Sequence, residues 1–154
     1  MKIECIKDKL IEAVGKADRL TGKNLSLPIL SCVDLKATRN SLVIRATNLD
    51  CGIEIKIPAK VDVEGETALH GGVITSLLAG LPKEKNITLE SKEGNIVIST
   101  SANTTLIKTF SPDDFPNIPK LETNNVIEIN PKLLVKGFKS VVYSASLSTV
   151  KPEL

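Results

Sequence analysis

The feature that most constrains this chain is an alternating passage that occurs twice. Residues 33–57, VDLKATRNSLVIRATNLDCGIEIKI, match the passage at 87–110 when the sequence is laid on itself without gaps at an offset of 54 residues. Alternation of apolar and polar residues is typical of strands with one buried face. The apolar residues that coincide are Val33 with Ile87, Leu35 with Leu89, Leu42 with Ile96, Val43 with Val97, Ile44 with Ile98, and Ile53 with Ile107.

A second offset, of 124 residues, lays the start of the chain on its end. IECIKDKLIEAV then meets IEINPKLLVKGF, a strand pattern followed by an amphipathic helix pattern. The predicted elements are strands at 2–6, 30–38, 41–47, 51–57, 66–70, 86–91, 95–101, 104–110 and 126–130, and helices at 7–21, 72–80 and 131–146. Their order is strand, helix, three strands, twice, and then strand and helix again. A repeated unit explains this order, although amphipathic strand trios can also resemble one another by composition alone.

The predicted fold is α+β, with two βαβββ modules that place helices on one face and antiparallel sheets on the other. Residues 1–125 would form one domain, and residues 126–154 would begin a second, incomplete one. The stretch 111–125 contains three prolines and is interpreted as a linker or strap, because proline cannot donate to a sheet ladder. Gly15, in the middle of the first predicted helix, suggests close packing there.

Basic residues are concentrated on two of the three predicted helices, although the net charge is only +2. Positions 9, 12, 16, 19 and 23 advance by three and four residues and so share one helix face, on which only Glu12 is acidic. A solvated surface explains such a stripe, and so does contact with a phosphate backbone. The candidate nucleic-acid-binding residues of these stripes are Lys9, Lys16, Arg19 and Lys23, with Lys132, Lys136 and Lys139 on the last helix.

Any such nucleic-acid contact should be indifferent to sequence. No aromatic residues alternate with the basic ones, which argues against stacking on single strands, and no helix-turn-helix or zinc-finger pattern is present. The second helix, GVITSLLAG, carries no basic residue at all.

No catalytic constellation is found, and neither a metal nor a cofactor is expected. His70 is interpreted as a structural or exposed residue, and Asp113 and Asp114 as turn residues. The three cysteines, Cys5, Cys32 and Cys51, have no metal-ligand spacing and are interpreted as small buried apolar residues. No apolar run is long enough to cross a membrane, and the start of the chain lacks a signal-peptide pattern, so a cytoplasmic protein is expected.

Several short motifs resemble those of the bacterial DNA polymerase III beta subunit family, the sliding clamps. They are LPIL at 27–30, TNLD at 47–50, GLP at 80–82 and DFPN at 114–117. YSASLSTVKPEL, near the end, resembles the start of that family's middle domain. The resemblance runs over the whole chain almost without gaps and implies the first clamp domain plus the first strand and helix of the next.

The resemblance implies a non-enzymatic processivity factor for the replicative polymerase. Two such chains form a head-to-tail ring around double-stranded DNA, with helices lining the hole and sheets forming the outer wall. Its partners would be the DNA polymerase III core, whose complex includes a 3′–5′ exonuclease, and the clamp loader. The ring holds DNA by topology, which would explain the modest positive charge.

The resemblance also implies individual site residues. Asn24, with Lys23 beside it, stands where the family usually has a basic DNA contact. Ser148 and Lys151 stand where it has a polar and a basic one. At the start of the second helix the family has another basic residue, whereas this chain has Gly72. The first-domain half of the ring contact would lie around the edge strand 104–110, at Thr105 and Ile107, and around the short helix.

Two other hypotheses remain open at this point. One is a βαβββ protein-interaction scaffold that does not contact DNA, and the other, more distant, is an enzyme whose site is assembled from residues far apart. If the clamp interpretation holds, these 154 residues contain little of the family's partner-peptide pocket. We then expect them to be a fragment that does not close a ring by itself.

Overall fold

The structure is a computed structural model that describes residues 1–22, 27–81, 84–119 and 127–145. The chain divides into two compact units, Met1–Ile118 and Pro119–Leu154, which are described separately below.

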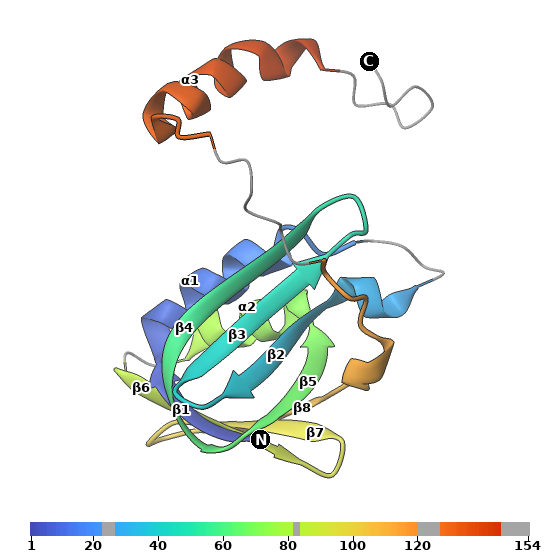
Figure 1. Cartoon of the computed structure of the whole chain (residues 1–154). Coiled ribbons are helices and arrows are strands. Elements are labelled where there is room, and N and C mark those ends of the chain that lie inside the picture. The colour runs from blue at the N-terminus through green and yellow to red at the C-terminus, as the bar shows by residue number, and fades with distance from the viewer. Residues whose placement is uncertain (23–26, 82–83, 120–126, 146–154) are drawn as a thin grey trace. The chain divides into compact units, whose positions relative to one another are not determined.

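The first unit contains eight strands and two α-helices within the described residues (Figure 1). In chain order they are β1 (Lys2–Ile6), α1 (Lys7–Asp18), β2 (Cys32–Thr38), β3 (Ser41–Thr47), β4 (Gly52–Val63), β5 (Gly65–His70), α2 (Gly71–Gly80), β6 (Asn86–Lys92), β7 (Asn95–Ser99) and β8 (Thr104–Lys108). Two short 3₁₀ helices, η1 (Pro28–Ser31) and η2 (Pro112–Asp114), precede β2 and follow β8. This is the predicted order of two βαβββ modules.

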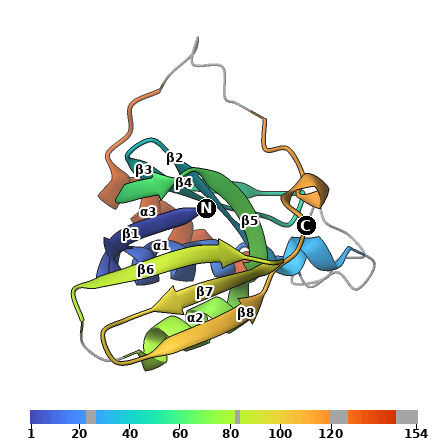
Figure 2. The same cartoon turned by 90° about the horizontal axis from the view of Figure 1, so that it is seen from below.

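All strands pair antiparallel in one curved sheet of order β5-β2-β3-β4-β1-β6-β7-β8. Strands β1 to β4 of the first module correspond to β5 to β8 of the second. When each strand is exchanged for its counterpart, the cyclic order of the sheet stays the same and is only shifted by four places. The two modules are therefore related by an approximate twofold axis, and each completes its sheet with the first strand of the other. Figure 2 shows α1 and α2 together on one side of these strands.

The register of the pairs shows where the repeat holds and where it slips. In the first two sheet strands of each module the offset of 54 is kept, since Leu35 faces Ile44 and Leu89 faces Ile98. In the last strand the offset is 50, because Leu42 faces Ile57 while Ile96 faces Ile107. The ungapped match of Ile53 with Ile107 is therefore wrong. The β3–β4 hairpin extends two pairs further before its turn, which displaces the returning strand.

The sheet almost closes on itself. At one join, β1 pairs with β4, and Glu4 faces Lys60. At the equivalent place in the other half, only one bridge remains, in which the backbone N–H of Phe110 donates to the carbonyl oxygen of Ala68 at 2.7 Å. The second join is shorter because β8 ends before it reaches β5.

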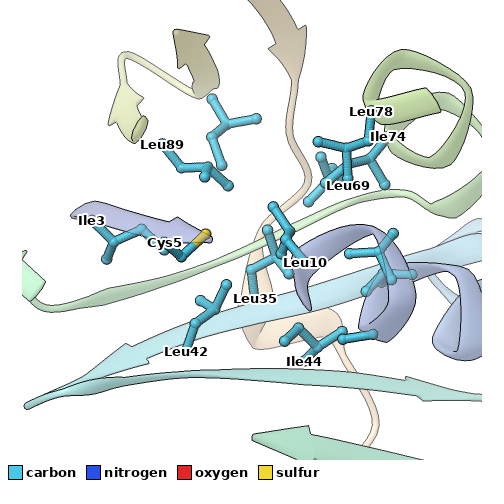
Figure 3. Packing of buried hydrophobic residues seen from close by; sticks show 14 of the residues in the cluster. Ile3, Cys5, Leu10, Leu35, Leu42, Ile44, Leu69, Ile74, Leu78 and Leu89 are labelled. Carbon is cyan, nitrogen blue, oxygen red and sulfur yellow. The ribbon is translucent and has the colours of Figure 1, made fainter. Parts of the chain in front are cut away.

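The core lies between the sheet and the two helices. It consists almost entirely of aliphatic side chains, as the scarcity of aromatic residues predicts (Figure 3). Leu10 and Val14 of α1 and Ile74 and Leu78 of α2 are at most 1% exposed. These four residues occupy equivalent places in the two helices, so the helix pair is buried symmetrically.

The ends of α2 are stabilised by charged residues of α1. Lys7, only 6% exposed, donates from Nζ to the carbonyl oxygen of Leu81 at 3.4 Å, beyond the last turn of α2. Asp18 lies against Gly71, the first residue of α2, where a Cβ atom would be 2.3 Å from its carboxylate oxygen. A cation at the C-terminus and an anion at the N-terminus of a helix both favour the helix dipole.

Three local predictions are wrong for identifiable reasons. β4 does not end at residue 57 but continues to Val63, because its second half pairs with β1 after Pro58 has closed the β3 ladder. Cys51 is exposed, because it lies in a turn where Asn48 Oδ1 accepts from the N–H groups of Asp50 and Cys51. Gly15 has no close neighbour, since a Cβ atom there would meet nothing within 4 Å.

The other two cysteines are buried, as predicted. Cys5 and Cys32 are buried, and burial raises the pKa of the Cys5 thiol to about 12. Residues 110–118 form a strap that lies against the sheet of the first unit, with Phe115 only 8% exposed, while residues 120–125 of the expected linker lie outside the described residues.

The second unit contains one α-helix in its described residues, α3 (Pro131–Val141), followed by the short 3₁₀ helix η3 (Val142–Ser144). Asn130 caps α3, because its Oδ1 accepts from the N–H of Lys132 at 3.0 Å. The strand expected at 126–130 is not formed at 127–130, while Val126 lies outside the described residues. A strand requires a neighbouring strand for its backbone hydrogen bonds, and residues 127–130 have none among the described residues.

Two glycine substitutions should have opposite effects on stability. Gly71→Ala should lower the free energy of unfolding by about 1–2 kcal/mol, because the new methyl group displaces Asp18 from the N-terminus of α2. Gly15→Ala should raise it by about 0.5–1 kcal/mol, because alanine favours the helix and its methyl group meets open space. Urea unfolding followed by circular dichroism measures both. Equal effects of the same sign would contradict the described packing.

Candidate nucleic-acid interface

The basic stripe on α1 lies on its exposed face. Lys9, Lys16 and Arg19 are exposed, whereas Leu10 and Ala17 have no exposed area and face the sheet. The predicted helix face is therefore confirmed for these three residues, whose charged groups can approach a ligand. Lys23 and Asn24, which the stripe and the resemblance add, lie outside the described residues.

One of the three basic residues already has an acidic partner. Lys16 Nζ lies 2.7 Å from a carboxylate oxygen of Glu12, one turn earlier on the same helix. The hydrogen bond and charge of Lys16 lower the pKa of the Glu12 carboxyl below its usual value. Both side chains are more than half exposed, so water and salt screen the pair and an incoming anion could replace Glu12. Lys9 and Arg19 form no salt bridge within the described part of the chain.

The second helix, α2, contributes exposed residues to this surface but no charged side chain. Its exposed residues are Val73, Ser76, Ala79 and Gly80. Lys7 of α1 donates to the carbonyl oxygen of Leu81, just beyond the C-terminus of α2, and is buried there. The interface on the first unit is therefore one-sided, with its positive charge on α1.

The basic residues of α3 are also exposed. Lys132, Lys136 and Lys139 lie on the described surface of the second unit, and Lys139 stands in the last turn, where a cation favours the helix dipole. Ser148 and Lys151 lie outside the described residues.

The apolar residues of α3 match the buried face of α1. At the offset of 124 residues, the counterparts of Leu10, Ala13, Val14 and Ala17 are Leu134, Gly137, Phe138 and Val141. The four α1 residues are at most 3% exposed, whereas Leu134, Phe138 and Val141 are 43%, 64% and 60% exposed. They line one side of an apolar groove on α3, together with Ile129 and Leu133.

The two residues expected at a ring contact lie on the strand at one edge of the sheet. β8 pairs with β7 and, among the described residues, with no other strand along its length. Ile107 is 7% exposed and belongs to the core, while Thr105 is half-buried on the same face. Leu106 and Lys108 point to the other face and are exposed. The free backbone edge and these outward side chains, more than the Ile107 side chain, are therefore accessible to a partner.

The described residues contain no group of three or more His, Cys, Asp and Glu side chains that could hold a metal ion. His70 is exposed, at the junction of β5 and α2. Asp113 belongs to η2, where its N–H donates to Ser111 Oγ at 3.3 Å, in keeping with the predicted turn. No helix among the described residues is long and apolar enough to span a membrane.

Sequence reasoning missed a charged cluster around the buried Asp34 on the outer face of the sheet. Asp34 has no exposed area and is paired with Arg45 on the next strand. The signal was available, because alternation within β2 places Asp34 and Lys36 on the face opposite Leu35. What the sequence does not indicate is that the strap covers this face.

Comparison with known proteins gives one family throughout. The family model described as the DNA polymerase III beta subunit, N-terminal domain, matches residues 1–119. A beta sliding clamp of Helicobacter pylori is 27% identical over 155 aligned residues, which cover 100% of this chain and 41% of the relative. A beta sliding clamp of Synechococcus elongatus is 22% identical over 148 residues, covering 95% of this chain and 40% of the relative.

Solved structures agree with the fold. A putative DNA polymerase III beta subunit from Eubacterium rectale superposes with a TM-score of 0.90 at 26% identity, covering 96% of this chain and 40% of that one. A Helicobacter pylori beta clamp bound to a DNA ligase peptide superposes with a TM-score of 0.82 at 26% identity, covering 96% of this chain and 41% of that one. The chain thus spans about 40% of the length of the relatives it matches.

Removing the acid of the α1 stripe should strengthen any binding of nucleic acid. We expect Glu12→Gln to tighten binding of a short duplex at low salt by roughly two- to threefold, because it removes a repulsive charge and releases Lys16. Fluorescence anisotropy measures this. The control is Glu54→Gln, an exposed acid on β4, for which no comparable change is expected. A tightening of the same size in both variants would show that only net charge matters.

Proposed function

This chain belongs to the family of the DNA polymerase III beta subunit, N-terminal domain, and from that membership we propose that it is part of a beta sliding clamp. The protein would be a ring that encircles double-stranded DNA and holds the replicative polymerase on it. It would act as a non-enzymatic accessory subunit, in the cytoplasm.

The observation that carries this proposal is the segregation of helices and strands in the first unit. α1 and α2 share one side of the curved sheet, and the exposed face of α1 presents Lys9, Lys16 and Arg19. Such a surface suits contact with the phosphate backbone, which carries no sequence information. A closed ring would hold DNA without tight binding, and a low net charge lets it slide.

The second unit supports the same proposal. The apolar face of α3 corresponds residue by residue to the face that α1 buries, and its basic residues are exposed beside it. We therefore assign residues 1–125 to the first clamp domain and residues 126–154 to the start of the middle domain. α3 would then pack on strands of that domain as α1 packs on its own sheet.

The edge strand β8 is the part of the first unit best suited to the ring contact. Its outer backbone edge pairs with no other strand in the described part of the chain, and Thr105 and Ile107 would fix its register from the core side. The second clamp chain would bind here head to tail. The other partners would be the DNA polymerase III core and the clamp loader, and the clamp solved with a ligase peptide is consistent with binding of partner peptides.

A charge-reversal variant tests the DNA-facing role of α1. Lys16→Glu/Arg19→Glu should abolish the chemical-shift changes that a short duplex causes in α1 amides of the isotopically labelled chain. In the unchanged chain, these changes should be the same for two duplexes of different sequence. The affinity should fall roughly twentyfold between about 50 and 150 mM salt if three phosphates are contacted.

The matched control reverses two lysines on the opposite surface. Lys56 and Lys60 are exposed on β4, away from the helices, and Lys56→Glu/Lys60→Glu should leave the shift changes in α1 intact. If the duplex perturbs β4 as much as α1, or perturbs neither, the helix face is not the DNA-facing surface. The alternative of a protein-interaction scaffold without DNA contact would then be favoured.

A further inference from the structure

The strap that follows β8 lies over Arg45 in the charged cluster around Asp34, on the outer face of the sheet. We define the strap as residues 110–118. It is attached at its start by the hydrogen bond from Phe110 to Ala68, and at its end Ile118 packs on Gly52, where a Cβ atom would be 3.2 Å from the Ile118 side chain. Between them, Phe115 is 8% exposed.

The cluster beneath the strap joins three strands. Arg45 on β3 donates from Nε to Asp34 Oδ2 at 2.9 Å, and its terminal nitrogen lies 2.8 Å from the same oxygen. Arg45 also pairs with Glu66 on β5, whose other carboxylate oxygen lies 2.6 Å from Lys36 Nζ. The Arg45 guanidinium carbon lies 5.7 Å from the centre of the Phe115 ring, within the range of a cation–π contact.

The geometry connects the strap directly to Asp34. Asp34 faces Arg45 on one side and Ala68 on the other, and Ala68 is the residue that Phe110 bridges. The strap therefore begins next to the strand residue that flanks Asp34 and then places Phe115 on the arginine that pairs with it. Lifting the strap would uncover Arg45, which is 17% exposed, and with it the buried Asp34 that it pairs with.

Asp34 is incompletely satisfied where it lies. Its Oδ1 has no hydrogen-bond partner among the described residues, although the side chain has no exposed area. Burial raises the pKa of the Asp34 carboxyl to about 6, against the opposing effect of Arg45. Glu66 raises this pKa further and Lys36 lowers it, while Asp113 and Asp114 of the strap are exposed.

We propose that the strap is a latch whose closure is coupled to the charge of Asp34: a neutral Asp34 keeps it closed, and an ionised Asp34 favours its opening. The reason is reciprocity. If closing the strap makes Asp34 harder to ionise, ionising Asp34 makes the strap harder to close. Arg45 limits this penalty through its pairing with Asp34, and Phe115 covers Arg45.

The latch also determines where the chain leaves the first unit. Ile118 is the last residue of that unit, and its anchor is Gly52 at the end of the long β3–β4 hairpin. With the latch closed, the departure point is fixed on this hairpin. With the latch open, it returns towards Phe110, at the start of the strap. The latch involves only residues of this chain and is independent of the proposed clamp function.

Amide hydrogen exchange of the whole chain, corrected for intrinsic rates, tests the latch. The opening equilibrium of residues 110–118 should increase about tenfold from pH 5 to pH 7 and change little above that, because opening returns Asp34 from a pKa of about 6 to its ordinary value of 3.8. In Asp34→Asn the opening equilibrium should be independent of pH. Asp62→Asn, which neutralises an exposed acid on β4, should leave the pH dependence unchanged.

A second measurement tests the latch without relying on the folding of Asp34→Asn. In Phe115→Leu, the carboxyl of Asp34 should titrate closer to its ordinary range in carbon-detected NMR, and the protection of the strap should fall more than that of β2 and β3. Three results would overturn the proposal. They are a strap that opens only with global unfolding, a pH dependence that persists in Asp34→Asn, and an Asp34 titration unaffected by Phe115→Leu.

Discussion

The rest of the first unit depends on the packing of α1 against α2. Each module supplies only one helix, which covers only part of the module's sheet. Neither module can therefore bury the apolar face of its sheet alone. Leu10 and Val14 meet Ile74 and Leu78 in one aliphatic core, and the sheet curves around the pair. The strand exchange follows from the same requirement, because β1 and β5 extend the sheet of the opposite module.

This packing also divides the charges of α1 between structure and surface. Lys7 and Asp18 stand at opposite ends of α1, which runs antiparallel to α2. Lys7 therefore lies at the C-terminus of α2 and Asp18 at its N-terminus, and both stabilise α2. Lys9, Lys16 and Arg19 lie on the face that the sheet and α2 leave open. The candidate interface is thus the face of α1 that does not pack in the core. α2 has no charged residue and therefore adds no charge to this interface.

The two modules differ most on the outer side of the sheet. The first module has a longer β3–β4 hairpin and carries the Asp34–Arg45–Glu66 cluster, and the strap that follows the second module folds back over both. At the equivalent positions of β6, the second module has Thr88 and Glu90 and no buried ion pair. The repeat is therefore symmetric in its core and asymmetric on its outer surface.

The sequence by itself determined the modules, because periodic burial leaves a pattern in the residues: the order of elements, the core faces of α1 and β3, and the basic stripe follow from spacing alone. It could not give the slip of four residues at Ile57, the continuation of β4 past Pro58 or the exposure of Cys51, since each depends on which strand lies beside which. The interface residues could be placed on a helix face but not assigned a partner. Only the tertiary structure decided that Lys7 is buried and that the Phe115 ring lies over Arg45, the partner of the buried Asp34. The physical reason is that burial of a charge depends on residues far apart in the chain, and no local pattern records them.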